Sequence, residues 1–177
     1  MRRVAIIGGG PAGMLAGMAA ARAGAQVTLY EGNEKLGKKL YLTGKGRCNL
    51  TNAAGREQFF EKVVHNGRFL HSAFARFDNR DMMRLLEEEA GLALKTERGG
   101  RVFPESDKSS DVIAALARLL AKAGVTVRLR EKVTGLATAG EGILLRAGGQ
   151  EQQYDAAILA TGGGSYPSTG CDGSGWA

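Results

Sequence analysis

The distribution of apolar and polar residues along the chain predicts an α/β protein that begins with a strand, a helix and a second strand. Residues 4–7 form an apolar run without alternation, as in a strand buried on both faces of a parallel sheet. Small apolar residues dominate 11–23, and Gly24 ends the helical pattern. Val27, Leu29 and Tyr30 then predict a second strand that closes at Glu31. These two strands are expected to be parallel neighbours joined by the helix.

The middle of the chain has a different pattern. Residues 32–52 are rich in Gly, Lys and Asn without a sustained period, which predicts a long loop on the surface or against a ligand. Three helical segments are expected in 56–90, the last opening near Asp78, and residues 92–103 are typical of a hairpin around a glycine turn. We therefore expect a helical and hairpin side lobe at about 53–108.

The last third of the chain discriminates between fold variants. Ser110 is expected to cap a helix that ends at Gly124, and a strand follows at 125–129. Residues 131–155 then show three short strands and no helical period, before a further buried strand at 156–160. A plain NAD-dependent Rossmann domain would continue with a helix, so a β-meander crossover favours the FAD-binding variant.

Composition agrees with a folded domain. Hydrophobic residues make up 44% of the 177 residues, Gly accounts for 27 of them and Pro for 3, and no Gly-X-Y period appears. This is enough apolar material for a core, and it excludes collagen-like and disordered chains. We expect one FAD-binding domain over residues 1–177, with the side lobe inserted in it.

Charge and cysteine content limit the partners. The net charge is +6, but the basic residues are spread out, without aromatic interleaving or an RNA-binding motif, so nucleic acid is not the expected partner. Cys48 and Cys171 lie far apart, which predicts neither a disulfide framework nor a metal site and favours a reducing, cytoplasmic setting. Glycines interrupt the apolar N-terminus, so we expect neither a signal peptide nor a membrane span.

The first motif is Gly8-x-Gly10-x-x-Gly13, placed between the first strand and the helix. In this context the first glycine permits a tight turn, the second lets a pyrophosphate approach, and the third lets the helix pack on the strand. Glu31 ends the second strand, where a carboxylate accepts hydrogen bonds from ribose hydroxyls and repels the 2′-phosphate of NADP. The alternative, a glycine turn without a ligand, is disfavoured because strand, helix and acid occur together.

Two further clusters carry candidate chemistry. Residues 160–163, Ala-Thr-Gly-Gly, follow a parallel strand at the end where open α/β sheets bind ligands, although an ordinary turn is the alternative. In the loop 43–49, Arg47 is a candidate for a phosphate or a flavin carbonyl and Asn49 for a flavin edge; a solvated basic loop is the alternative. For Cys48 we favour a small buried residue over a redox role, because no second cysteine lies nearby.

The remaining candidates are left open. Residues 166–167, Tyr-Pro, with 172–173, Asp-Gly, are expected either to line the reactive end of a cofactor or to form a turn. His65 and His71 are expected on helix faces of the side lobe, where packing is favoured over a general-base role. No catalytic acid or base can be identified from the sequence.

Taken together, the motif at 8–13, the loop 43–52, the Gly-Arg-Val-Phe-Pro segment at 100–104 and the stretch 160–175 are similar to one family. The chain resembles the BaiN/YhiN-like flavoproteins, which are NAD(P)/FAD-dependent oxidoreductases, along essentially its whole length. The resemblance implies a glutathione-reductase-like FAD-binding Rossmann-type fold. It also implies FAD contacts from Gly8, Gly10, Pro11, Ala12 and Gly13 at the pyrophosphate, Glu31 at the adenosine ribose, and Lys39, Gly46, Arg47, Asn49, the backbone of Val133, Ala160, Thr161 and Gly162.

The same resemblance implies a function. The expected activity is hydride or electron transfer to or from a small-molecule substrate, with NAD(P)H as the candidate donor. Two alternatives stay open: a catalytically inactive FAD-binding fragment, and a flavoprotein that acts on RNA. Family members are longer, so the chain is expected to be an N-terminal part with a fold incomplete at its C-terminus. Lys45 stands where the family usually has glycine.

Overall fold

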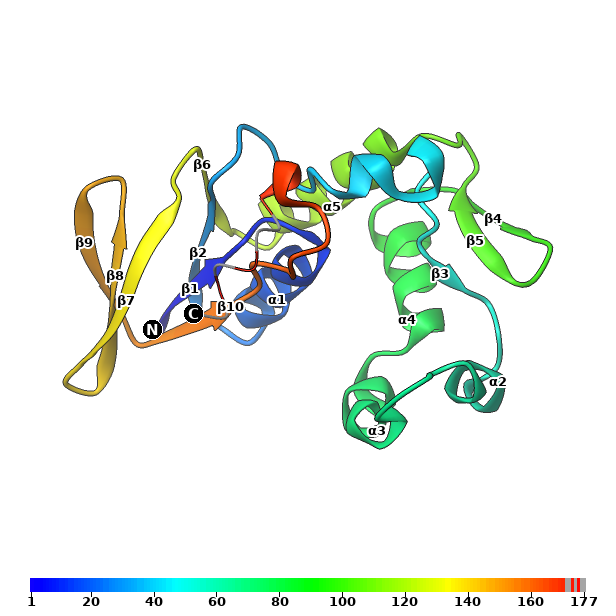
Figure 1. Cartoon of the computed structure of the whole chain (residues 1–177), viewed down its shortest axis with the longest axis horizontal. Helices are drawn as coiled ribbons and strands as arrows, with labels where there is room; N and C mark the ends of the chain where they lie inside the picture. The colour runs from blue at the N-terminus through cyan, green and yellow to red at the C-terminus, as the bar shows by residue number, and fades with distance from the viewer. Residues whose placement is uncertain (171–172, 174, 176–177) are drawn as a thin grey trace. The chain divides into compact units, whose positions relative to one another are not determined.

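A computed structural model describes residues 1–170, 173 and 175 of the chain (Figure 1). The chain divides into two compact units. The first comprises residues 1–41 and the residues from 116 onward, and the second comprises residues 42–115. Each unit is described by itself below.

The first unit is built on a parallel four-stranded sheet with the order β10-β1-β2-β6. Its strands are β1 (Arg3–Ile7), β2 (Gln26–Glu31), β6 (Thr126–Leu129) and β10 (Ala156–Leu159). The central strand β1 pairs in parallel with β2 on one side and with β10 on the other. Helix α1 (Pro11–Arg22) connects β1 to β2, as the parallel pairing requires. The predicted strand–helix–strand unit is confirmed.

The two faces of this sheet are covered differently. Ala5 and Ile7 of β1 share a buried cluster with residues of an antiparallel meander, Leu145, Ala147 and Tyr154. The meander consists of β7 (Val133–Ala139), β8 (Gly142–Ala147) and β9 (Gln150–Tyr154). Ile6 points to the opposite face, where α1 packs so closely that a Cβ atom on Gly17 would lie 3.6 Å from it. The predicted meander crossover is confirmed.

The second unit contains a small antiparallel sheet and several short helices. The sheet has the order β3-β5-β4, from β3 (Thr51–Asn52), β5 (Arg101–Pro104) and β4 (Leu94–Glu97). The helices are α2 (Arg56–Glu61), α3 (Gly67–Arg76) and α4 (Asn79–Arg84), and a π-helical turn at Leu85–Glu89 follows α4. Asp78 caps α4, since its carboxylate accepts hydrogen bonds from the Arg80 and Asp81 amides, each at 2.8 Å. The predicted helix start near Asp78 is confirmed.

Three local expectations were wrong. Helix α5 (Ser109–Lys122) begins one residue before Ser110, whose hydroxyl donates to the Asp111 carboxylate at 3.2 Å and therefore does not cap the helix. The stretch 32–52 is not all loop, because it contains 3-10 turns at Leu40–Gly46 and the strand β3. His65 precedes α3 and does not lie on a helix face.

Candidate functional site

The turn after β1 brings three segments into close contact. Gly8 has a φ of +109°, and its amide donates to the carbonyl of Tyr30 at 2.8 Å. A Cβ atom on Gly8 would lie 2.4 Å from the carbonyl oxygen of Ala160. A Cβ atom on Gly13 would lie 1.9 Å from the carbonyl oxygen of Gly8. Both positions therefore require glycine because the protein's own backbone fills the space.

Gly10 has a different environment. A Cβ atom there would meet no atom of residues 1–170, 173 and 175 within 4 Å, and the backbone has an ordinary extended conformation, with φ −73° and ψ 177°. Nothing in this described part of the chain therefore explains a glycine at this position. The open space beside Gly10 is the space that a close-approaching ligand would need.

The N-terminus of α1 faces this open space. Gly10 is the N-cap residue without a side-chain hydrogen bond, Pro11 has no amide hydrogen, and the first turn carries no acidic side chain. The amides of Ala12 and Gly13 have no acceptor within the helix at this end. The aligned peptide dipoles of a 12-residue helix add partial positive charge here, which favours an anion such as a pyrophosphate.

A cavity of about 530 Å³ opens at the carboxyl ends of β1, β2 and β10. Strand β1 lies between β2, the next strand along the chain, and β10, which the chain reaches much later. The cavity therefore lies at a topological switch point, where open α/β sheets bind ligands. Its lining includes most of the residues expected from the sequence: Gly8, Gly10, Pro11, Ala12, Glu31, Lys39, Val133, Ala160, Thr161 and Gly162. Gly13 lies behind the lining, against the Gly8 carbonyl.

Glu31 fixes the glycine turn at the edge of the cavity. One carboxylate oxygen accepts a hydrogen bond from the Gly9 amide at 2.8 Å. The other accepts two hydrogen bonds from Asn33, one from its backbone amide at 2.8 Å and one from its side-chain amide at 2.6 Å. The carboxylate is thus held in one orientation before any ligand arrives.

The cavity carries an excess of cationic side chains. Lys38, Lys39 and Lys132 line it, against Glu31 and Glu131. The Lys39 ammonium donates to the Ser165 hydroxyl at 3.0 Å. Together with the N-terminus of α1, these cations make the cavity suitable for a negatively charged ligand.

Sequence analysis missed Asn33, which lines the cavity although no periodicity or motif marks it. Pro167, for which a place at the cofactor site and a turn were both left open, begins the 3-10 turn Pro167–Thr169, and this turn lines the cavity. Tyr30 also contributes; its hydroxyl lies 2.7 Å from the Tyr154 hydroxyl and donates to the side-chain Oε1 of Gln152 at 3.0 Å. Burial and the bond to Tyr154 hold the pKa of Tyr30 well above its ordinary value, so this phenol stays protonated.

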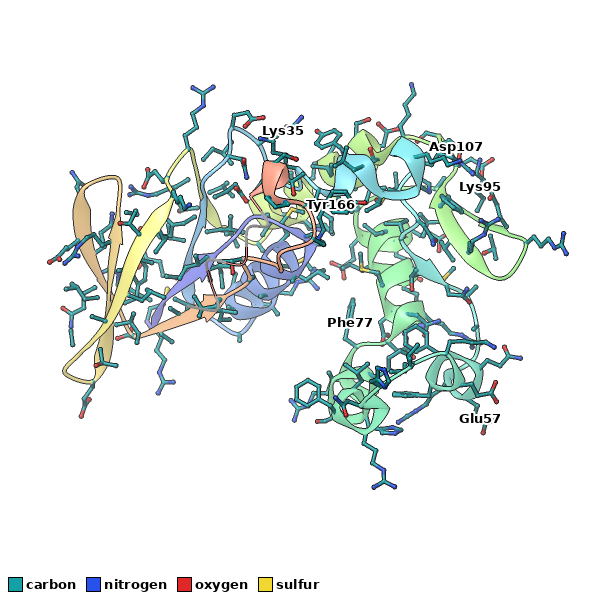
Figure 2. The ribbon with its side chains drawn as sticks, in the orientation of Figure 1. Lys35, Glu57, Phe77, Lys95, Asp107 and Tyr166 are labelled. Carbon is teal, nitrogen blue, oxygen red and sulfur yellow. The ribbon has the colours of Figure 1, made fainter. Side chains whose placement is uncertain are left out.

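The second unit holds the other expected residues, Gly46, Arg47 and Asn49. The Arg47 guanidinium donates to the Asp107 carboxylate at 2.7 Å, pairs with Glu97, and lies 4.2 Å from the centre of the Phe103 ring. Lys95 pairs with the same Asp107 at 2.7 Å, and the two side chains lie next to each other in Figure 2. Within this unit Arg47 therefore binds protein carboxylates and holds its loop against the hairpin.

These ion pairs shift the pKa values of Glu97, Asp107 and Arg47. Hydrogen bonds from Arg47 lower the pKa of Glu97, and hydrogen bonds from Lys95 and Arg47 lower the pKa of Asp107. Hydrogen bonds to Glu97 and Asp107 raise the pKa of Arg47 in turn. The two carboxylates and the guanidinium are therefore charged at neutral pH.

The neighbours of Arg47 in the loop also bind to their own unit. The Asn49 side-chain amide, oriented so that its nitrogen faces acceptors, donates to the carbonyls of Thr51 at 3.2 Å and Val102 at 3.3 Å. Cys48 is fully buried, and burial raises the pKa of its thiol, which confirms the expectation of a small buried residue. Cys171 and Asp172 lie outside the described residues.

The remaining sequence candidates concern His71, metal binding and membrane spans. The His71 ring stacks on Phe60, with ring centres 4.3 Å apart, which agrees with the packing role expected for it. Among residues 1–170, 173 and 175, no group of three or more His, Cys, Asp or Glu side chains is arranged to hold a metal ion. No helix in this described part is long and apolar enough to cross a membrane.

Comparison with known proteins decides the family. The family described as HI0933-like protein Rossmann domain matches residues 2–177. The chain belongs to this family. The expected resemblance to BaiN/YhiN-like flavoproteins is thereby confirmed.

Curated relatives extend beyond this chain. The 3-dehydro-bile acid delta(4,6)-reductase of Clostridium scindens is 38% identical over 100% of the chain and 43% of its own length. A ribosomal RNA dihydrouridine synthase of Escherichia coli is 33% identical over 93% of the chain and 40% of its own length. The chain thus spans less than half the length of these curated relatives.

Solved structures show the same fold. A crystal structure of THI4 from Thermovibrio ammonificans matches with a TM-score of 0.59 at 18% identity, covering 91% of this chain and 57% of that chain. Thioredoxin reductase of Lactococcus lactis matches with a TM-score of 0.50 at 19% identity, covering 92% of this chain and 36% of that chain. The predicted α/β Rossmann-type fold with a parallel sheet is confirmed.

Proposed function

We propose that this chain is the FAD-binding part of a flavin-dependent oxidoreductase. The observation that carries the proposal is the open space beside Gly10, which the packing of the described residues does not explain and which faces the N-terminus of α1. The pyrophosphate of a dinucleotide would accept hydrogen bonds from the first amides of α1. It could also approach closely here, because Gly10 has no side chain. The meander crossover favours FAD over a nicotinamide dinucleotide as the resident ligand.

The fit extends along the cavity. The pyrophosphate would lie against Gly10, Pro11, Ala12 and Gly13, and the adenosine ribose against Glu31. Glu31 already accepts three protein hydrogen bonds, so a ribose hydroxyl would meet a carboxylate that is held in place. Lys39, Val133 and residues 160–162 would form the remaining contacts in this unit. When bound, the flavin supplies hydride or electron transfer, and the protein binds and orients it.

The names of the relatives suggest a reaction class. One is a delta(4,6)-reductase of a bile acid derivative and the other makes dihydrouridine in ribosomal RNA. Each name describes the addition of two hydrogens to a carbon–carbon double bond. We therefore propose that the protein containing this chain reduces a conjugated double bond, with NAD(P)H as the electron donor and a small molecule as the substrate.

The RNA relative favours a second candidate, a flavoprotein that reduces a base in RNA. The net charge of +6 fits this candidate weakly. Retention of RNA that falls steeply with salt would favour it, because binding to phosphates releases counterions. Turnover of a small unsaturated substrate without RNA retention would favour the first candidate.

The proposal is tested by the visible spectrum of the purified chain after incubation with FAD and desalting. A retained oxidised-flavin spectrum that bleaches under anaerobic NADH or NADPH is expected. A chain that retains no flavin would contradict the assignment of this cavity to FAD. In that case, ADP titration would show whether the adenosine half alone is bound.

A further inference from the structure

Asn33 joins four segments that surround the cavity. Its side-chain amide donates to Glu31 at 2.6 Å and to the carbonyl oxygen of Thr169 at 3.2 Å. Its side-chain oxygen accepts from the Lys38 ammonium at 3.1 Å. Its backbone carbonyl accepts from the Arg130 amide at 2.9 Å. One residue thus connects the end of β2, the following loop, the segment before the meander and the turn at 167–170.

We propose that Asn33 is a positioning residue for the bound nucleotide, and that it controls how long the adenosine half of FAD stays in the cavity. The inference rests on the proposed function and goes beyond it, because Asn33 belongs to neither the glycine motif nor the ribose-binding acid. It acts through two neighbours: Glu31, which it orients, and the turn 167–170, which it tethers. Both neighbours line the cavity.

The chemistry of the side chain suits this role. The contact needs a donor toward Glu31 and Thr169 and an acceptor toward Lys38, and a side-chain amide provides both in one group. An aspartate at position 33 would keep the acceptor but would place a second carboxylate against Glu31 and the Thr169 carbonyl. An alanine would remove both functions. Asn33→Ala therefore tests the loss of these hydrogen bonds, and Asn33→Asp adds repulsion between the new carboxylate and Glu31.

The turn is packed against Asn33 from its other side. Gly170 has a φ of +87°, and a Cβ atom there would lie 2.8 Å from the Asn33 side-chain nitrogen. An alanine at position 170 would therefore push the turn away from Asn33 and strain the backbone as well. The turn is also held by the hydrogen bond between Lys39 and Ser165. Loss of the Asn33 contact should loosen the turn without detaching it.

The test compares FAD and ADP release from the full chain in the wild type and in Asn33→Ala, Asn33→Asp and Gly170→Ala. Dissociation is followed by stopped-flow displacement, and amide hydrogen exchange is measured in the ligand-free protein. We expect all three variants to release both ligands about tenfold faster or more. We also expect faster exchange at the Thr169 and Gly170 amides, which donate to the carbonyls of Tyr166 and Pro167.

The matched control is Arg146→Ala. It removes two side-chain hydrogen bonds, at 3.0 and 2.6 Å, between strands of the meander in the same unit and away from the cavity lining. We expect its release rates to equal those of the wild type. The urea midpoint of each ligand-free variant separates positioning from stability, since a purely structural role for Asn33 would lower the midpoint and leave release unchanged.

The outcomes are distinguishable. A wild-type chain that binds neither FAD nor ADP overturns the proposed function, and this inference with it. A wild type that binds, with Asn33 variants that release at the same rate, overturns this inference alone. Unchanged exchange at Thr169 and Gly170 in Asn33→Ala would also overturn it, because the tether would not exist.

Discussion

The carboxylate of Glu31 accepts a hydrogen bond from the backbone amide of Gly9 at 2.8 Å, and so joins the end of β2 to the turn that follows β1. The acidic residue expected to bind a ribose therefore also shapes the turn expected to bind the pyrophosphate. A change at Glu31 should affect both halves of the nucleotide site.

Glu31→Ala is expected to weaken FAD binding by about 1.5–3 kcal/mol, because a charge-assisted hydrogen bond to the ribose and the bond to Gly9 are both lost. ADP should be weakened by a similar amount, since the affected contacts lie on its half of the dinucleotide. Isothermal titration of both ligands measures this. Glu141→Ala, at an exposed position between β7 and β8 and outside the cavity lining, is the control. Equal affinities in Glu31→Ala and wild type would place the ribose elsewhere.

Gly13→Ala is expected to destabilise the ligand-free chain by about 3 kcal/mol, because the new methyl group would lie 1.9 Å from the Gly8 carbonyl oxygen. Gly17→Ala in the same helix is the comparison. Its methyl group would lie 3.6 Å from Ile6 and Leu120, an ordinary contact distance, so its stability should stay within about 1 kcal/mol of wild type. Urea unfolding measures both. Similar midpoints for the two variants would show that α1 does not approach β1 this closely.

Acid should weaken the ion-pair network of the second unit. The pKa values of Glu97 and Asp107 are lowered in the folded chain, so their stabilising contribution is full above their unfolded pKa values, near 4, and is lost as pH falls through the lower folded values. Both carboxylates are partly accessible to solvent, which screens the ion pairs, so the effect is modest.

Arg47→Ala removes the partner that Glu97 and Asp107 share. Its melting temperature should be below that of wild type at pH 7 and approach it as the pH falls from 5 toward 2. Calorimetry over this range, with Arg98→Ala as the control, tests the prediction. A difference between Arg47→Ala and wild type that is constant with pH would contradict the carboxylate pairing.

Lys45→Gly is expected to stabilise the loop by about 0.5–1 kcal/mol. Lys45 has a φ of +58° and a ψ of +41°, a left-handed conformation that costs a residue with a side chain about 1–2 kcal/mol, partly offset by the greater chain entropy of glycine when unfolded. This conformation favours glycine, the residue that the resemblance led us to expect at position 45. Thermal unfolding of Lys45→Gly and Lys45→Ala tests it, and a glycine variant no more stable than the alanine variant would contradict it.

The sequence predicted those parts of the structure that depend on local pattern. Residues 4–7 form a strand of the parallel sheet because an unbroken apolar run suits burial on both faces, and the mostly apolar stretch 27–30 forms its neighbour. The strand at Thr51–Asn52 was missed because two residues are too few to show alternation, and pairing with Val102 and Arg101 alone defines it.

Some residues of the candidate site could be predicted from local sequence signals, and others are brought together only by folding. The glycine motif and Glu31 are local signals, and the structure places them around one cavity. Asn33 and Thr169 are 136 residues apart, so only the folded chain brings them together. Arg47 was expected to contact the cofactor, but the sequence could not show that Glu97 and Asp107 already bind its guanidinium.

The most direct test of FAD binding in this cavity is a pair of substitutions at two glycines that share a conformation. Gly10 and Gly55 are both helix N-cap residues with extended backbones, and a Cβ atom on either would meet no atom of the residues that the structure describes within 4 Å. Gly10→Val should fold normally and lose FAD retention after desalting, because its side chain fills the space expected for the pyrophosphate. Gly55→Val should retain as much FAD as wild type. Full retention of FAD by a folded Gly10→Val variant would contradict the account.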